Sequence, residues 1–199
     1  MKKTFLVLTF CLFCLAAGAA YAQQVDAAFG VRTLMGTSAS SATGNYFPQY
    51  IGGGGYPTFS GDFLFRHNFG IGGEVSWRGK QDLYQGFQPF RPLFYDFNGI
   101  WAPKLSRAVS PELMAGIGAE SLRFYNGTLS CSAFSGCTNY TSNSHFMGHI
   151  GGGLRLYLHG NVFVRPEAHL YLIRNNVEFA GPRANSFGVS LGYSFRPSD

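Results

Sequence analysis

The sequence has no long apolar run after residue 22. No window there holds about 18 consecutive apolar residues, the length that would indicate a membrane-spanning helix. Only helices and closed barrels satisfy every backbone polar group inside a lipid bilayer. If the remainder of the chain enters a membrane, it must therefore do so with strands that close into a barrel.

Lysine is scarce, and neither sign of charge dominates. Lys2 and Lys3 precede residue 22, which leaves 13 of the 15 Lys and Arg residues against 10 Asp and Glu residues, a net charge of about +3. An excess this small and this evenly spread does not indicate nucleic-acid binding. After residue 22 the only lysines are Lys80 and Lys104. A water-facing sheet normally carries many lysines, so a polar exterior is not favoured.

Cysteine is limited to four residues, and Cys11 and Cys14 lie in the N-terminal apolar run. The other two, Cys131 and Cys137, lie six positions apart in a polar segment. In an exported protein this spacing predicts a local disulfide, with two free thiols as the alternative. Neither a third cysteine nor a histidine cluster accompanies them, so the sequence predicts no metal site and no cofactor.

The N-terminus has the pattern of a secretory signal peptide. Two lysines precede an apolar run over residues 5–17, and Ala20-Tyr21-Ala22 supplies a small-residue cleavage site. The apolar run is about 13 residues long, whereas a spanning helix needs about 20, so a membrane anchor is the weaker interpretation. We expect cleavage after Ala22, which divides the chain into a signal peptide over residues 1–22 and one domain over residues 23–199.

The domain alternates apolar with small or polar residues in eight segments of about ten residues, separated by clusters of Gly, Pro, Asn and Ser. Long connections at 37–57 and 126–144 alternate along the chain with short ones. This pattern predicts an all-β fold, a closed antiparallel transmembrane β-barrel of eight strands in up-and-down order, with short turns at the periplasmic end. The expected strands are 25–36, 58–67, 70–79, 91–102, 112–125, 145–158, 162–174 and 185–196.

One face of each expected strand is apolar, and the other carries small residues and charges of both signs. Isolated charges inside a narrow barrel cost several kcal/mol each, so we expect those of the second face to pair with one another in a charge network that plugs a polar lumen. The expected members are Arg32, Asp62, Arg66, Glu74, Arg78, Asp96, Glu120, Arg155, Arg165 and Glu167.

The same alternation would also describe a soluble lipocalin-like barrel, with an apolar cavity and a wet exterior, or a β-sandwich core. Small residues mixed with ion pairs favour the crowded lumen of an eight-stranded barrel instead. Aromatic residues near strand ends are typical of the girdles at membrane interfaces. Those on apolar faces are Trp77, Tyr95, Phe97, Trp101, Tyr193 and Phe195.

With its eight segments, its Arg165-Pro166-Glu167 element and its Gly192-Tyr193-Ser194-Phe195 ending, the chain resembles the small eight-stranded outer-membrane β-barrel family. That family includes the OmpA transmembrane domain and OmpX-like proteins. The resemblance implies export through the periplasm to the bacterial outer membrane, contact with its lipid, and recognition of Tyr193 and Phe195 by the barrel assembly machinery. Family barrels usually end at that aromatic residue, whereas four residues follow it here.

We predict no catalytic residue. Ser144, His145 and Glu120 could in principle form a Ser/His/Glu group. However, the sequence has no His-x-Ser followed by a suitably spaced Glu, as lipid A deacylases of this type would have. His149 and His169 could both face the lumen, but two ligands on neighbouring strands do not define a metal site.

The expected function is therefore structural or interactive, through extracellular loops that contact a surface or extracellular partner. The candidates are the loop that contains Cys131 and Cys137 and the aromatic first loop. The first loop contributes Tyr46, Phe47, Tyr50 and Tyr56. A narrow channel for small solutes is the alternative, and a lipid A-modifying barrel enzyme is less favoured.

Overall fold

The computed structural model describes residues 24–36, 51–65, 68–132, 136–179 and 181–195. The predicted signal peptide with its cleavage site after Ala22, Arg66, and Tyr46, Phe47 and Tyr50 of the first loop all lie outside these ranges. Within the ranges, no helix is long and apolar enough to cross a bilayer.

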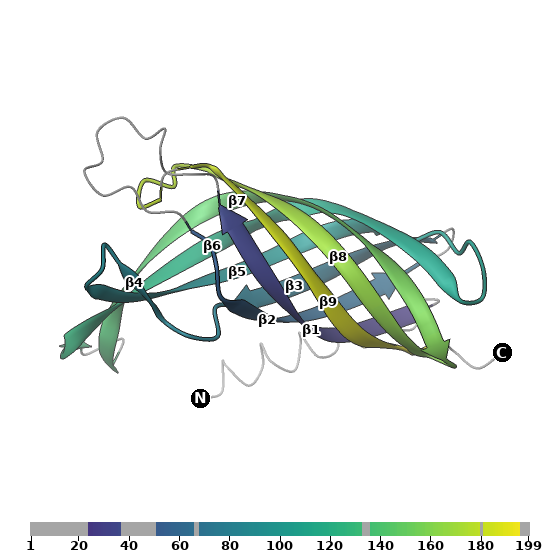
Figure 1. Cartoon of the computed structure of the whole chain (residues 1–199), viewed down its shortest axis with the longest axis horizontal. Coiled ribbons are helices and arrows are strands. Elements are labelled where there is room, and N and C mark those ends of the chain that lie inside the picture. Colours follow the sequence, from purple (N-terminus) through teal and green to yellow (C-terminus); the bar gives the residue numbers. More distant parts are fainter. Residues whose placement is uncertain (1–23, 37–50, 66–67, 133–135, 180, 196–199) are drawn as a thin grey trace, which may run out of the picture.

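The described chain is all β, and eight long strands wind around a common axis with one short extra strand (Figure 1). The strands are β1 (Gln24–Gly36), β2 (Gly55–Leu64), β3 (Phe69–Trp77), β4 (Asp82–Tyr84), β5 (Gln88–Trp101), β6 (Val109–Ser132), β7 (Gly136–His159), β8 (Val162–Ile173) and β9 (Arg183–Phe195).

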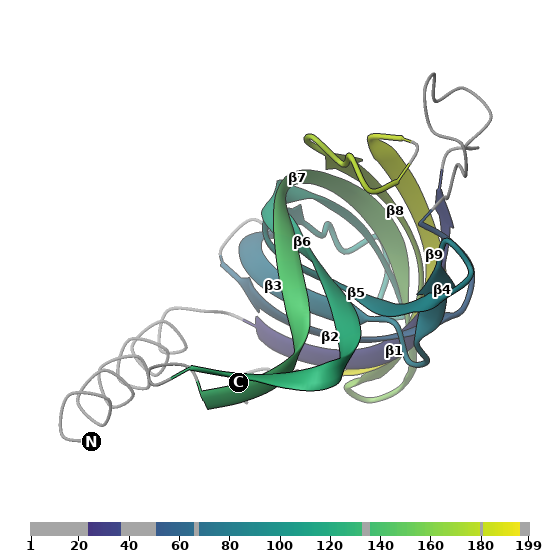
Figure 2. The ribbon, with the colours of Figure 1, turned by 90° about the vertical axis from the view of Figure 1, so that its left-hand side faces the viewer.

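The sheet closes on itself, as the view along the axis shows (Figure 2). Consecutive long strands pair antiparallel, β3 pairs with β5, and β1 pairs with β9 to complete the ring. Among the described strands, the short β4 pairs with β5 alone. This confirms the predicted closed antiparallel barrel of eight strands in up-and-down order.

The apolar face of the strands points outward, and the small and polar face points into the barrel. On β9, Phe187, Val189 and Leu191 are about half exposed, whereas Ser186 and Ser190 are buried. Because side chains alternate between the two faces of a strand, this one assignment sets the direction for the rest of the barrel. The outer wall is thus apolar, as contact with lipid requires.

The two ends of the barrel differ. One, here called the short-turn end, carries the connections between β2 and β3, β5 and β6, and β7 and β8. The other, the long-loop end, carries β4, the tip of the β6–β7 hairpin and the segment 174–182 between β8 and β9 (Figure 1).

The expected loop at 126–144 is wrong, because β6 and β7 continue through most of it as a hairpin of 24 residues on each strand. Tyr125 pairs with Tyr140, and Cys131 pairs with Cys137. Ser, Thr and Tyr of this segment suit a strand, but the segment lies beyond the membrane-facing wall and has no apolar face to reveal its period. The expected loop after β3 likewise contains β4, whose turn uses positive φ at Gln85 and Gly86.

Candidate functional site

The candidate site is the lumen, which side chains fill in successive layers. The first layer contains three fully buried arginines, Arg32 on β1, Arg155 on β7 and Arg165 on β8. Each occupies an inward position of its strand, so the alternation of side chains directs three guanidinium groups from separate strands into the lumen.

Arg155 and Arg165 share carboxylates with each other. Arg155 pairs with Asp26, Asp62 and Glu112, with 3.0 Å between its Nη2 and Asp62 Oδ2. Arg165 Nη1 lies 2.8 Å from Glu112 Oε1 and 3.3 Å from Asp62 Oδ2. Two arginines therefore bridge the same pair of acids, and removing any one of these four side chains leaves buried charge uncompensated.

Glu167 and Glu74 extend the network to Arg32. Arg165 Nε donates to Glu167 Oε2 at 2.7 Å, and Arg32 Nε donates to Glu167 Oε1 at 2.8 Å. Arg32 also pairs with Glu74 and donates to the Tyr171 hydroxyl at 3.1 Å. The three arginines and five acids thus form one connected charge network across the lumen.

Two histidines form the next layer of the lumen, on the side of the charge network that faces the long-loop end. His149 Nε2 lies 2.8 Å from His169 Nδ1, and His149 Nδ1 lies 2.8 Å from Asn98 Oδ1. Asp96 borders this layer, with its Oδ1 3.4 Å from His149 Nδ1. Among the described residues no three His, Cys, Asp or Glu side chains gather as a metal site would require.

The long-loop half of the lumen is closed by an apolar plug. Phe179, from the segment between β8 and β9, inserts among the aromatic residues, with its ring centroid 5.4 Å from Phe90 and 5.7 Å from Tyr84. The principal members of this plug are Tyr56, Phe90, Phe94, Leu122, Phe124, Met147 and Phe179, all buried.

Glu178 holds the plug segment in place. Its carboxylate accepts a hydrogen bond from Asn143 at 2.8 Å and pairs with His145 Nε2 at 2.9 Å. The Tyr84 hydroxyl donates to the backbone carbonyl of Glu178 at 2.9 Å. The segment is thereby tied to both β4 and β7, and it covers the mouth of the barrel.

The structure places nine of the ten predicted lumen charges, in several groups, and the tenth, Arg66, lies outside the described residues. Arg32, Asp62, Glu74, Arg155, Arg165 and Glu167 lie in the charge network. Arg78 pairs instead with Asp82 at the mouth, at 2.8 Å, and Asp96 lies beside the histidines. Glu120 is fully buried, and neither of its oxygens has a hydrogen-bond partner among the described residues. The expected pairing fails at Glu120 because the plug around it is apolar.

Sequence reasoning missed Asp26 and Glu112, although both could have been found. Asp26 and Arg32 are separated by an even number of positions on β1, and so are Glu112 and Glu120 on β6. Residues at such a spacing lie on the same face of a strand. Parity also places Phe90 and Phe94 on the inner face with Asp96. The plug was missed because the alternation assigns these residues to the inner face but does not show that they cluster at one end of the lumen.

Tyr56 was expected in an exposed loop, and that expectation is wrong. It lies on β2, is 1% exposed and belongs to the plug, with its ring 6.1 Å from Phe94. The glycine run before it gave the segment the look of a loop, but the strand begins at Gly55, within that run.

Ser144 and His145 point to opposite faces of β7. His145 lies directly across from Glu120 on the inner face, whereas the Ser144 hydroxyl lies 3.5 Å from that of Ser121. The residues considered for a Ser/His/Glu group are thus divided between the two sides of the wall.

The remaining predicted residues lie at the extremes of the barrel. A disulfide joins Cys131 and Cys137 at the tip of the β6–β7 hairpin. Tyr193 and Phe195 lie outward at the end of β9, with ring centroids 4.8 Å apart. Recognition of these two aromatics during assembly stays a prediction.

Comparison with known proteins agrees with this architecture. A search of the curated proteins finds no match. Among solved structures, Ail, the attachment invasion locus protein of Yersinia pestis, in complex with the heparin analogue sucrose octasulfate, aligns with a TM-score of 0.55 at 13% identity, over 86% of this chain and 98% of Ail. Neisserial surface protein A aligns with a TM-score of 0.60 at 10% identity, over 86% of this chain and 96% of that one.

The N-terminal β-barrel domain of Pseudomonas aeruginosa OprF aligns with a TM-score of 0.55 at 12% identity, over 87% of this chain and 98% of that domain. These alignments show a shared fold. The sequence itself matches the model of the outer membrane protein beta-barrel domain over residues 6–195. The chain therefore belongs to the outer membrane protein beta-barrel domain family.

Proposed function

We propose that the protein is a plugged outer-membrane barrel whose function is to contact a partner outside the cell through the β6–β7 hairpin. The observation that carries this proposal is the projection of the hairpin beyond the rest of the barrel (Figures 1 and 2). β5 pairs with β6 only as far as Phe124, and β8 pairs with β7 only from Met147. Beyond these points the two strands pair with each other.

The chemistry of the projecting hairpin suits a protein partner. Tyr125 and Tyr140 face each other with ring centroids 6.1 Å apart, and the Arg123 guanidinium lies 5.1 Å from the Tyr140 ring. Leu129 is 71% exposed. Tyr and Arg are enriched at protein interfaces, and an open strand edge can add a strand from a partner.

The test is a trimmed variant in which a two-residue Asn-Gly turn replaces residues 126–139. Because Tyr125 and Tyr140 are already paired, such a turn can join them without altering the barrel below. Bacteria that display the full or the trimmed protein would be compared for adhesion to immobilised extracellular-matrix proteins and to heparin. We expect adhesion by the full protein and its loss on trimming.

A matched control changes the other projecting turn. Leu83 and Phe87 are exposed and apolar, so the double variant L83S/F87S removes apolar surface near β4 and leaves the hairpin intact. Equal adhesion by the full and trimmed proteins would contradict the proposal. Steady ion conductance by the full protein would favour the alternative function, a narrow channel for small solutes.

A further inference from the structure

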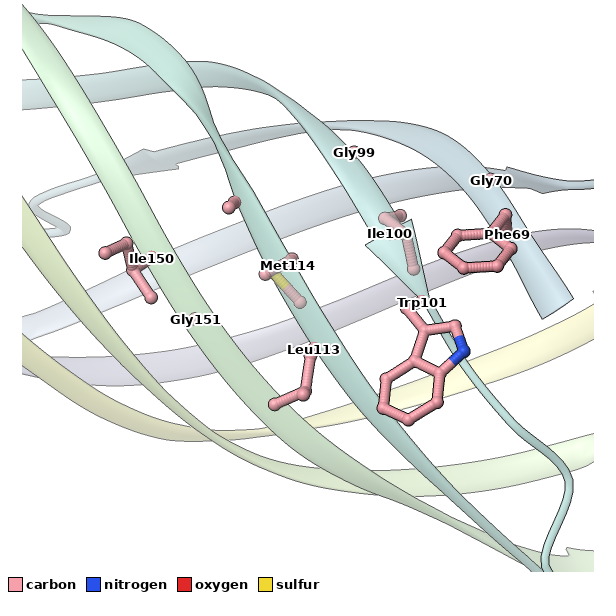
Figure 3. Close-up of a pocket in the computed structure, with 10 residues that line it drawn as sticks. Phe69, Gly70, Gly99, Ile100, Trp101, Leu113, Met114, Ile150 and Gly151 are labelled. Atoms are coloured by element: carbon pink, nitrogen blue, oxygen red, sulfur yellow. The ribbon is translucent and has the colours of Figure 1, made fainter.

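The outer wall has a hollow near the short-turn end, with a volume of about 620 Å³ (Figure 3). It lies where β3, β5, β6 and β7 run side by side. Its outward-facing lining consists of Phe69, Gly99, Trp101, Leu113, Ala115 and Ile150.

Two small residues create the hollow. Gly99 on β5 lies directly across from Ala115 on β6, so neither strand has a large outward side chain at this position. Ile71 is the partner of Gly99 on the other side, and Ile150 is the partner of Ala115. The floor is therefore bounded on both flanks by large aliphatic side chains.

The neighbouring row of outward residues, on the side of the short-turn end, consists of large aromatic and aliphatic side chains that border the hollow. Phe69 pairs with Trp101, and Trp101 pairs with Leu113. Trp101 is 43% exposed on the outer wall. An indole at the end of a spanning strand is typical of the membrane interface, where its ring lies at the headgroup level.

Two cations lie in the turn that follows Trp101. The turn 102–108 that joins β5 to β6 carries Lys104 and Arg107, both exposed. Neither takes part in an ion pair with any residue that the structure describes. In outer-membrane barrels the short turns lie on the periplasmic side. We therefore expect these cations to lie beside the headgroups of the periplasmic leaflet of the outer membrane.

We propose that the hollow holds an acyl chain of an anionic phospholipid from the periplasmic leaflet, and that Lys104 and Arg107 bind its phosphate. The wall faces hydrocarbon, so an apolar occupant is required. A recess with a floor of glycine and alanine between large side chains suits a flexible chain better than a flat protein surface. The two cations of the turn that follows Trp101 supply the charge complement to an anionic headgroup.

Gly99 gives a direct test of chain binding. A Cβ there would meet nothing nearer than the Ala115 carbonyl oxygen at 3.7 Å, so a leucine fits the wall and fills the hollow. Gly61, also outward but on β2 and outside the hollow, would have nothing within 4 Å of its Cβ. The variant Gly61→Leu is therefore a matched control.

The measurement is native mass spectrometry of the full-length protein released from nanodiscs that contain phosphatidylglycerol and phosphatidylcholine in equal amounts. We expect the unaltered protein and Gly61→Leu to retain phosphatidylglycerol over phosphatidylcholine, and Gly99→Leu to retain several-fold less of it. The double variant K104A/R107A should lose the preference for phosphatidylglycerol while it still retains some lipid of either kind. A gel shift between unheated and boiled samples checks that each variant is folded.

Three results would overturn the proposal. One is the absence of retained phosphatidylglycerol on the unaltered protein, and another is an equal loss in Gly99→Leu and Gly61→Leu. The third is a protein dimer that disappears only in Gly99→Leu, because the hollow would then be the contact between two copies of the chain.

Discussion

Arg165 is the residue on which the charge network most depends. It pairs with Asp62, Glu112 and Glu167 and donates to the Ser60 hydroxyl at 2.9 Å. Asp62 and Glu112 also pair with Arg155, and Glu167 also pairs with Arg32. A change at Arg165 therefore alters the balance of charge around both other arginines.

The variant Arg165→Met should destabilise the barrel by about 3–5 kcal/mol, because it leaves buried carboxylates without a compensating charge. The measurement is urea-induced unfolding in lipid vesicles, followed by tryptophan fluorescence. Arg174→Met is the control, since Arg174 is exposed and should change stability by less than about 0.5 kcal/mol. Similar unfolding midpoints for the two variants would show that the network does not stabilise the fold.

Glu120 and Glu112 offer a comparison of two acids on the same face of one strand. Glu112 pairs with two arginines, whereas Glu120 is buried without a partner among the described residues. Replacing a buried polar group that lacks a partner with an apolar one removes its desolvation cost of about 1–3 kcal/mol. We therefore expect Glu120→Leu to raise the urea midpoint and Glu112→Leu to lower it. A lower midpoint for Glu120→Leu would show that its carboxylate is satisfied by water or an ion in the lumen.

Much of the lumen could be predicted from the alternation of residues alone. Once Arg155 and Arg165 are assigned to the inner face, parity identifies the inward residues of each strand. Parity does not tell at which height along the axis two strands meet, because that depends on their register. The sequence therefore could not separate Glu112, beside the arginines, from Glu120, inside the plug.

At the scale of elements, the β6–β7 hairpin has two parts with different physical constraints. The part next to β5 and β8 has apolar side chains outward, as at Leu113, Ile117 and Ile150. The projecting part has no neighbouring strand in the described chain and is closed by its disulfide. An isolated two-stranded hairpin is only marginally stable in water, so the disulfide should matter there and little elsewhere.

The double variant C131S/C137S should open the hairpin tip without weakening the barrel. Closing a loop this short is worth about 2 kcal/mol in the chain-entropy model. Cleavage of the tip by a protease at low concentration should therefore become on the order of thirtyfold faster. The urea midpoint of the barrel should stay the same. If the barrel midpoint falls together with protease resistance, the hairpin and barrel unfold as one unit.

The elements were predictable to different degrees for a physical reason. Strands in contact with lipid must alternate, and β8 and β9 lie within a few residues of their predicted bounds. The projecting strands extend beyond the part of β6 and β7 that pairs with β5 and β8, so we expect no lipid contact to force an apolar period on residues 126–144. The short β4 depends on pairing with β5, which a local pattern does not reveal.

At the scale of the whole molecule, the lumen is blocked by layers in series. The charge network fills the half near the short turns, the histidines follow, and the aromatic plug closes the mouth. An eight-stranded barrel is just wide enough for side chains to fill. We expect the charge network and the aromatic plug each to close the lumen, so opening one of them leaves the other closed.

This arrangement predicts the behaviour of the barrel in planar lipid bilayers. The unaltered protein should give no steady conductance steps. Phe179→Ala, which shortens the side chain that inserts among Phe90 and Tyr84, should also give none, because the charge network below is unchanged. Combining Phe179→Ala with Arg165→Ala opens both layers and should produce steps, provided that the gel shift shows a folded barrel.

The two single variants separate this account from the channel hypothesis. If Phe179→Ala alone conducts, ions pass between the paired arginines and carboxylates, and the plug segment is then the gate of a narrow pore. If Arg165→Ala alone conducts, the aromatic plug is permeable and the charge network is the barrier. If neither single variant conducts and the double variant does, the lumen must contain two layers, each of which is sufficient to close it.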